Sequence, residues 1–493
     1  MSKALVVGAG IAGLAVALRL RKKGYEVTVF EGNAYPGGKL HEFSLGSYRF
    51  DWGPSLFTMP HLVTELFELF NEDASQHFNY IEKDNSCIYF WEDGARLKAA
   101  TNPKVFIDKL VSDFGEDKAQ IENYLKGNQK KYDLTAKLFL ESSLHKLKTY
   151  LSKDTLKALI NYRKLDLYNT LNDVNKKNFS NPKIIQLFNR YATYNGSDPY
   201  KTPGIMSMIP HLEMEMGTYF PNGGMHSITK SLYDFAISKG VSFQFNNRVK
   251  QIEITNSKAT GVHTRKGYYE ADIVVTNSDI AATYEELLRE QKAPTRTLSQ
   301  EKSSSAIIFY WGIARSFPQL DLHNILFSED YQKEFNTIFN ELMPPEDPTV
   351  YINISSKNNS EDAPEGCENW FVMVNAPSAS GQDWVSIKKQ VRKSIIAKTN
   401  KILGTDIEKY IVEENSLDPL EIEKKTGSVG GALYGASSNS KFAAFLRHPN
   451  FSSSISGLYF CGGSVHPGGG IPLCLLSAKI TSDLIPEVLI NEG

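Results

Sequence analysis

The sequence predicts an α/β fold, and three features of the chain lead to that expectation. Near the N-terminus, short apolar runs flank a stretch with helical spacing, as in a parallel sheet whose strands alternate with helices. Two glycine-rich segments, residues 8–13 and 457–480, lie more than 400 residues apart. The region between them mixes helical and strand patterns, and the apolar run at residues 305–313 predicts a strand. A chain of 493 residues is also long enough for about three domains of roughly 150 residues, with a large core and an extended pocket.

The first glycine-rich segment follows an apolar run, residues 3–7, that predicts a buried strand. Gly8 permits a tight turn, Gly10 lets the main chain approach a pyrophosphate, and Gly13 lets the following helix pack closely on the strand. The helix start offers free amides and a positive dipole end to an anion. A second strand ends at Glu31, whose carboxylate can accept hydrogen bonds from an adenosine ribose. This arrangement predicts a Rossmann-like dinucleotide-binding domain, for either FAD or NAD.

Composition excludes several other classes of protein. A net charge of −2 and a pI near 6.6 provide no positive field for a nucleic-acid partner. Four scattered cysteines predict neither a disulfide framework nor a metal site, and they favour a reducing cytosol. Apart from the glycine-containing N-terminal run, no segment approaches the roughly 18 apolar residues that span a bilayer. We expect a cytoplasmic protein.

A second close-approach loop follows Glu31, where Gly37, Gly38 and Lys39 suit a larger cofactor that lies along the domain. Further characteristic segments are "DWGPSLFTMP", "NRYATYNGSDPYKTPGIMSMIPHLE", "GTYFPNGGMHSITKSL", "APEGCENWFVMVNAP", "GALYGASS" and "GLYFCGGSVHPGGGIP". Together they resemble the superfamily of FAD-dependent amine oxidases and carotenoid desaturases, and within it the phytoene desaturase family, along nearly the whole chain. Lys39 stands where these proteins more often have arginine. The C-terminal segment is most similar to the bacterial 1-hydroxycarotenoid 3,4-desaturase branch.

The resemblance implies one FAD held by both ends of the chain. The FAD-binding domain, of the glutathione reductase or amine oxidase type, is expected from discontinuous segments, 1–70, 218–289 and 426–493. An α+β substrate domain with a helical portion is expected from 71–217 and 290–425. The expected cofactor contacts are Gly8, Gly10, Ile11, Ala12, Gly13, Glu31, Gly37, Gly38, Lys39, Gly53, Pro54, Val249, Gly462, Gly463, Gly470 and Ile471. A bound nicotinamide that reduces the flavin would need a second strand, GxGxxG and helix unit, and the sequence contains none. We therefore expect electrons to pass from the substrate to FAD and then to dioxygen or a membrane quinone.

Desaturation beside a polyene removes a hydride and a neighbouring proton, and FAD can accept the hydride. His466, in the C-terminal glycine loop, is the candidate to accept or polarise the proton, although a histidine that only hydrogen-bonds the backbone of a tight turn fits equally well. Cys461 is interpreted as buried packing rather than a covalent flavin attachment. The resemblance places Trp52, Phe57, Tyr219 and Tyr434 at a substrate tunnel near the flavin.

The implied reaction is formation of a C-3',4' double bond in a hydroxylated gamma-carotenoid. Phytoene desaturation, amine oxidation on the same scaffold and a non-enzymatic flavin-containing lipid carrier are the alternatives. A lipophilic carotenoid must enter from a membrane, which implies peripheral contact with the inner face of the cell membrane. Residues 55–70 and 204–216 are candidate docking segments, but neither is basic on its polar side, and a core-facing role is the stronger interpretation.

Overall fold

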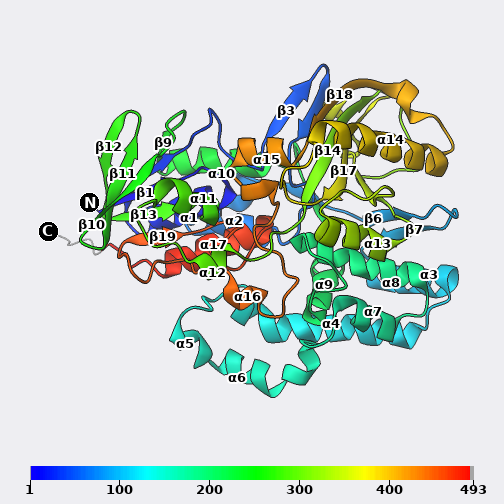
Figure 1. Cartoon of the computed structure of the whole chain (residues 1–493), viewed down its shortest axis with the longest axis horizontal. Coiled ribbons are helices and arrows are strands. Elements are labelled where there is room, and N and C mark those ends of the chain that lie inside the picture. The colour runs from blue at the N-terminus through cyan, green and yellow to red at the C-terminus, as the bar shows by residue number, and fades with distance from the viewer. Residues whose placement is uncertain (1, 489–493) are drawn as a thin grey trace.

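The computed structural model describes residues 2–488 and contains a five-stranded parallel sheet on the left of Figure 1. Its strands, in spatial order, are β19 (Leu458–Phe460), β13 (Ile273–Thr276), β1 (Lys3–Val7), β2 (Glu26–Phe30) and β9 (Ser242–Gln244). Strands from the beginning, middle and end of the chain therefore hydrogen-bond side by side. This confirms the predicted Rossmann-like α/β fold, while the exact domain boundaries stay a prediction.

Helix α1 (Ile11–Lys22) lies between α10 (His226–Ser238) and α17 (Ile471–Asp483). Ten consecutive residues of α1, 11–20, are buried, because neighbouring helices and the sheet cover it on several sides. Arg19 is buried among them and pairs with Glu65 of α2 (His61–Glu68). Small antiparallel units complete this half: β10 (Gln251–Thr255), β11 (Lys258–Thr264) and β12 (Gly267–Glu270); β3 (Glu42–Leu45) and β4 (Tyr48–Asp51); β5 (Tyr80–Glu82) and β8 (Tyr219–Pro221).

The other half is organised around a seven-stranded sheet in which only the β15–β6 pair is parallel. Its strands, in spatial order, are β18 (Ile411–Leu417), β14 (Ser305–Ile313), β17 (Glu368–Ala376), β16 (Val350–Asn353), β15 (His323–Leu326), β6 (Asn85–Phe90) and β7 (Arg96–Ala100). All nine residues of β14 are buried, so the continuous apolar run at 305–313 is a two-sided core strand.

Helices cover both faces of this sheet. Helix α14 (Trp384–Leu403) packs on one face through Trp384, Ile387 and Ile395. The opposite face meets α3 (Pro103–Phe114), α4 (Lys118–Phe139) and α8 (Pro182–Asn189). The remaining helices are α5 (Leu147–Tyr150), α6 (Lys153–Ile160), α7 (Leu171–Asn178), α9 (Ile209–Met214), α11 (Ile280–Ala282), α12 (Thr295–Leu298), α13 (Tyr331–Asn336), α15 (Pro419–Thr426) and α16 (Ala443–Leu446).

Both candidate membrane segments bury apolar side chains in the core, in keeping with the core-facing interpretation. Within residues 55–70, Leu62, Val63, Leu66 and Phe67 of α2 are buried in the same cluster as α1 and α17. Within residues 204–216, Ile209 and Met214 are buried against the helices of the second half. Among residues 2–488, no helix combines the length and hydropathy needed to cross a bilayer.

Candidate functional site

The predicted cofactor loops meet at the carboxyl edge of the parallel sheet. Strand β1 leads into Gly8, β2 into Glu31, β13 into Asn277 and β19 into Cys461. Because all these strands run in the same direction, the residues that follow them gather at one edge, where open α/β sheets bind ligands. Sequence segments hundreds of residues apart therefore form one candidate cofactor site.

The first glycine loop has the predicted tight geometry. Gly8 has a φ of +102°, and its N–H donates to the carbonyl of Phe30 over 2.8 Å. A Cβ on Gly13 would overlap the carbonyl oxygen of Gly8, so helix and strand approach as closely as glycine allows. The amides of Ile11 and Ala12, at the start of α1, have no partners inside the helix. They are suited to a pyrophosphate.

Asn277 joins the two ends of the chain at this site, and sequence reasoning missed it. Its Oδ1 accepts a hydrogen bond from the N–H of Gly13 over 3.1 Å, and its Nδ2 donates to the carbonyl of Cys461 over 3.2 Å. It thus supplies from another segment the helix cap that Gly10, the N-cap residue, cannot provide. The available signal was weak, since one asparagine after a predicted strand is common in turns.

Glu31 directly follows β2, and its carboxylate accepts hydrogen bonds that fix the first glycine loop. Its Oε2 accepts from the N–H of Ala9 over 2.8 Å, and its Oε1 accepts from the N–H of Asn33 over 2.9 Å. The N–H of Asn247 donates to the carbonyl of Glu31 over 3.0 Å, which brings the loop containing buried Val249 beside it. The structure therefore gathers Glu31 and Val249 at one place; their contacts with an adenosine stay a prediction.

The glycine–glycine–lysine loop lies on the first glycine loop. The N–H of Gly37 donates to the carbonyl of Ala9 over 2.8 Å, and both Gly37 and Gly38 have positive φ. The Nζ of Lys39 donates to the carbonyls of Ala432 and Leu433 over 3.2 and 3.1 Å. Lys39 thereby ties this loop to the C-terminal part of the chain, and burial lowers the pKa of its ammonium group.

Gly53, which precedes Pro54, and the C-terminal glycines lie close to these loops. Gly53 packs on the backbone of Lys39, where a Cβ would overlap the Lys39 carbonyl oxygen. Gly462 lies against Asn277: a Cβ there would be 2.5 Å from Nδ2. Gly463 approaches Gly469, and Gly470 with a φ of +106° precedes Ile471 at the start of α17. A Cβ on Gly470 would meet no atom within 4 Å, so this helix start has open space beside it.

His466 is held in one tautomer inside the C-terminal loop. It is 1% exposed, and its Nε2 lies 2.9 Å from the carbonyl oxygen of Ser142, so Nε2 carries the proton. Nδ1 is then a bare acceptor without a hydrogen-bond partner in the described chain. Burial lowers the pKa of His466 to about 4, which keeps the ring neutral near pH 7.

Arg447 places a buried positive charge against the same loop. A Cβ on Gly468 would lie 3.1 Å from its Cζ. Within the described residues 2–488, the guanidinium donates to Ala436 O and Ser438 Oγ alone, over 3.2 and 3.4 Å. Its Nη1 has no partner among residues 2–488, and no carboxylate there lies within ion-pair distance. Burial lowers the pKa of Arg447 to about 10, so it remains charged at neutral pH. An unpaired cation beside glycine loops fits an anionic cofactor.

The four predicted tunnel residues do not form one cluster. Phe57 and Tyr219 are adjacent: the N–H of Tyr219 donates to the carbonyl of Phe57 over 2.9 Å. Trp52 packs in a different cluster, and Tyr434 lies against Gly469 of the C-terminal loop. Tyr434 therefore adjoins the C-terminal glycine loop, Phe57 packs in the same core cluster as Ile11 and Ile471, and the tunnel itself stays a prediction.

Cys461 directly follows β19 rather than lying inside it. It is 1% exposed within the core of the parallel-sheet half, and burial raises the pKa of its thiol, in keeping with packing.

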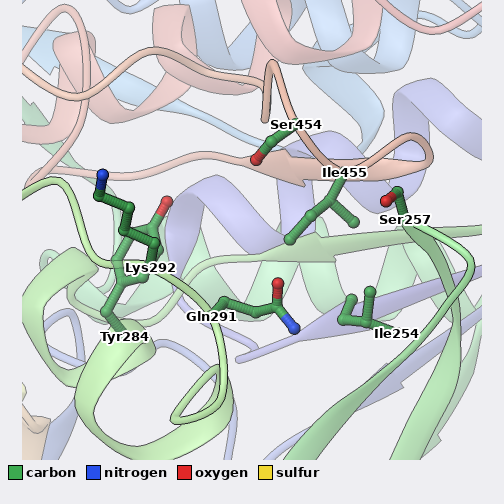
Figure 2. Close-up of a pocket in the computed structure, with 7 residues that line it drawn as sticks. All are labelled: Ile254, Ser257, Tyr284, Gln291, Lys292, Ser454 and Ile455. Carbon is green, nitrogen blue, oxygen red and sulfur yellow. The ribbon is translucent and has the colours of Figure 1, made fainter.

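A cavity of about 400 Å³ lies away from this site, beside β10 (Figure 2). Its walls include Ile254, Tyr284, Gln291 and Ile455, and none of the predicted cofactor or tunnel residues lines it. We assign it no role in catalysis.

Comparisons with known proteins agree with this geometry. Residues 11–486 match the family described as flavin containing amine oxidoreductase. The chain is 59% identical to a 1-hydroxycarotenoid 3,4-desaturase of Flavobacterium sp. (strain P99-3), over 99% of each chain. It is 30% identical to a 4,4'-diaponeurosporene oxygenase of Staphylococcus aureus (strain MSSA476), over 98% of this chain and 97% of the other. In structure it is similar to cyclohexylamine oxidase from Brevibacterium oxydans, with a TM-score of 0.61, 14% identity and 98% of each chain covered.

The chain belongs to the flavin-containing amine oxidoreductase family. The predictions of a flavin enzyme with FAD as cofactor are confirmed. The tight glycine loops, the open start of α17 and the unpaired Arg447 all fit that cofactor.

Replacing Asn277 with aspartate should weaken FAD binding and lower stability by about 1–3 kcal/mol, because the Cys461 carbonyl loses its donor. The added negative charge also lies beside the amides suited to a pyrophosphate. Flavin content after gel filtration and the thermal midpoint measure the two effects. Asn415→Asp adds the same charge at an exposed strand position and is the matched control. Equal behaviour of the two variants would contradict the assigned role of Asn277.

Proposed function

We propose that the protein is an FAD-dependent desaturase that forms the C-3',4' double bond of a hydroxylated gamma-carotenoid. The observation that carries this proposal is 59% identity, over 99% of both chains, to a 1-hydroxycarotenoid 3,4-desaturase. The glycine loops support it, since loops from both ends of the chain lie together at one edge of the parallel sheet. The 30% identity to an oxygenase over a similar length makes that activity less strongly supported.

FAD, when bound, supplies the acceptor for a hydride from the substrate carbon. The amides of Ile11 and Ala12 would hold its pyrophosphate, and Arg447 would add a fixed positive charge at the C-terminal loop. Loss of a hydride beside a polyene leaves a delocalised cation, and loss of a proton from the neighbouring carbon completes the double bond. A proton on a carbon next to a cation is acidic, so a weak base suffices. Neutral His466, with its free Nδ1, fits that task.

Replacing His466 with glutamine should lower kcat by about 100-fold or more while leaving the flavin spectrum intact. Glutamine can still donate to the Ser142 carbonyl but cannot accept the proton as a base. His448→Gln is the control, because both ring nitrogens of buried His448 are occupied, by Tyr284 Oη at 3.1 Å and Pro449 O at 2.8 Å. If both variants lose stability and keep kcat, His466 only supports the loop.

The solubility of the proposed substrate suggests where the enzyme works in the cell. A carotenoid partitions into bilayers, so we propose that the enzyme is cytoplasmic and associates peripherally with the inner face of the cell membrane. Dioxygen or a membrane quinone would accept the electrons. Oxygen consumption with substrate in detergent, compared with anaerobic turnover on addition of a quinone, separates the two acceptors.

Chromatography and mass analysis of products test the reaction itself. FAD-loaded protein is given hydroxylated gamma-carotene, phytoene and an amine panel. We expect the hydroxylated substrate to lose two hydrogens and to lengthen its chromophore. Three results would each contradict the proposal. Consumption of phytoene alone would indicate a phytoene desaturase, gain of an oxygen atom an oxygenase, and peroxide release from amines an amine oxidase. Substrate binding without bleaching of the flavin absorbance under anaerobic conditions would indicate a carrier.

A further inference from the structure

The segment that joins α4 to α7 turns its apolar side chains outward. We call residues 142–168, which include α5 and α6, the α5–α6 arm; Figure 1 shows both helices at the lower edge of the molecule. Leu151 is 80% exposed, Tyr168 79% and Ile160 74%. Leu147, Leu156, Leu159, Tyr150 and Tyr162 are also exposed. Such a concentration of large apolar side chains marks an interaction surface rather than scattered exposure.

Helix α6 shows the arrangement most clearly. Thr155 and Ala158 face inward, where Ala158 packs with Leu138 and Leu144 in a small cluster. Leu156, Leu159 and Ile160 form a stripe at helical spacing on the outer face. A core-facing helix would bury that stripe and expose the threonine, so the orientation of α6 is the reverse of ordinary packing.

The arm is strongly basic although the whole chain is slightly acidic. The arm contains six cationic residues, Lys146, Lys148, Lys153, Lys157, Arg163 and Lys164, and two acidic residues, Asp154 and Asp166, of which Asp166 pairs with Lys131 of α4 over 2.7 Å. Asp154 lies 3.3 Å from Lys137 of α4, so it is also partly neutralised from outside the arm. The net charge of the protein is −2, so the positive charge is local to this surface.

Helix α16 extends the same surface next to the candidate site. Phe442 and Phe445 are exposed, the Nζ of Lys441 lies 5.0 Å from the Tyr168 ring centre, and Phe445 packs on Phe139. The chain then runs directly from α16 into Arg447. At the other end of the arm, the carbonyl of Ser142 binds Nε2 of His466. The apolar, basic surface therefore borders the loop assigned to FAD.

We propose that the α5–α6 arm and α16 form a docking surface for a bilayer rich in anionic lipid. The apolar stripe would enter the acyl boundary while lysine and arginine side chains meet the headgroups. A second copy of the chain is less suited to this surface, because a symmetric interface would bring two basic arms together. The role of the surface in substrate entry rests on the proposed function, whereas binding to lipid does not.

Vesicle flotation of the full-length, FAD-loaded protein tests the proposal. Vesicles of phosphatidylcholine with phosphatidylglycerol should bind the protein at least 10-fold more strongly than phosphatidylcholine alone, and salt should reduce that preference. The variant L156S/L159S/I160S should lose binding to both vesicles by about 10-fold or more, because it removes the inserted stripe. The control V385S/V412S/L420S replaces exposed apolar residues elsewhere and should bind like the wild type.

A second pair of variants separates charge from apolar insertion. K148Q/K153Q/K157Q should lose the preference for anionic vesicles, whereas K389Q/K393Q, on exposed positions of α14, should keep it. Flavin content and the thermal midpoint confirm that each variant is folded. The proposal would be overturned if the L156S/L159S/I160S variant floated with vesicles as the wild type does. It would also be overturned if the wild type bound no vesicles and instead formed a concentration-dependent dimer that this variant abolished. The vesicles contain no carotenoid and desaturation is measured in detergent, so failure of docking and failure of the proposed activity are distinguishable.

Discussion

Replacing Gly13 with alanine should yield a protein that retains little FAD and unfolds at a lower temperature. A Cβ at this position overlaps the carbonyl oxygen of Gly8, which is backbone and cannot rotate away. Helix α1 must then shift from β1, at a cost of about 1–3 kcal/mol for overpacking, and the amides of Ile11 and Ala12 move with it. The ratio of flavin to protein absorbance after gel filtration, together with thermal unfolding, measures both consequences.

The matched control is Gly127→Ala, which makes the same substitution inside α4. A Cβ on Gly127 would meet no atom within 4 Å, so alanine should raise stability by about 0.5–1 kcal/mol through the lower entropy of the unfolded chain. FAD content should not change. If Gly13→Ala retains FAD and stability as Gly127→Ala does, the close approach of α1 to β1 is not required for the site.

Replacing Arg190 with leucine should cost about 3–5 kcal/mol of stability, because it leaves the buried carboxylate of Glu213 without its counterion. The Arg190 Nη2 lies 3.2 Å from Glu213 Oε2 and donates to Tyr89 Oη over 2.7 Å. Tyr191 and Tyr194 also donate to Glu213, Tyr191 over 3.0 Å. These groups tie β6, α9 and the turn after α8 together beneath the seven-stranded sheet. Chemical denaturation at pH 7 measures the cost.

The pH dependence of that cost has a definite sign. Burial acts to raise the pKa of Glu213, but Arg190 and the two tyrosine hydroxyls outweigh it, so the folded pKa lies below its ordinary value. The wild type therefore keeps this stabilisation above the ordinary carboxyl pKa and loses it as the pH falls through the folded value. Without Arg190, burial raises the pKa, and protonation of Glu213 on acidification favours the folded variant. The stability deficit of Arg190→Leu should shrink as the pH is lowered from 7.

Arg392→Leu provides the control for ion-pair loss at the surface. Arg392 contacts Glu408 and Glu414 at 2.6 and 2.8 Å, where solvent screens the charges, so its loss should cost about 0–1 kcal/mol. Equal costs for Arg190→Leu and Arg392→Leu would contradict the buried-pair interpretation.

Several parts of the fold and site could be predicted because their cause is local. The strand at 305–313 has the length and apolar continuity of a core strand, and the structure contains it with those bounds. The glycines at 8, 10 and 13 could be interpreted from the sequence, because only glycine permits the tight turn and the close approach of helix to strand at these positions. The strand, glycine turn, helix and second strand before residue 40 were sufficient to predict a dinucleotide-binding domain, whereas the segments 218–289 and 426–493 were expected only from the family resemblance.

Other features depended on which helices and strands pack together in the folded chain, and a local sequence pattern does not specify those contacts. The helices α2 and α6 are both amphipathic, yet α2 buries Leu62 and Leu66 while α6 exposes Leu156 and Leu159. Asn277 acquires its role only because β13 lies between β1 and β19, which sets one side chain between Gly13 and Cys461. The sequence by itself determined the dinucleotide-binding turn and the glycines that it needs, and its resemblance to a known family indicated FAD. Tertiary structure alone decided the partners of Asn277, Arg447 and the α5–α6 arm, because pairings between distant segments depend on packing that no local run of residues encodes.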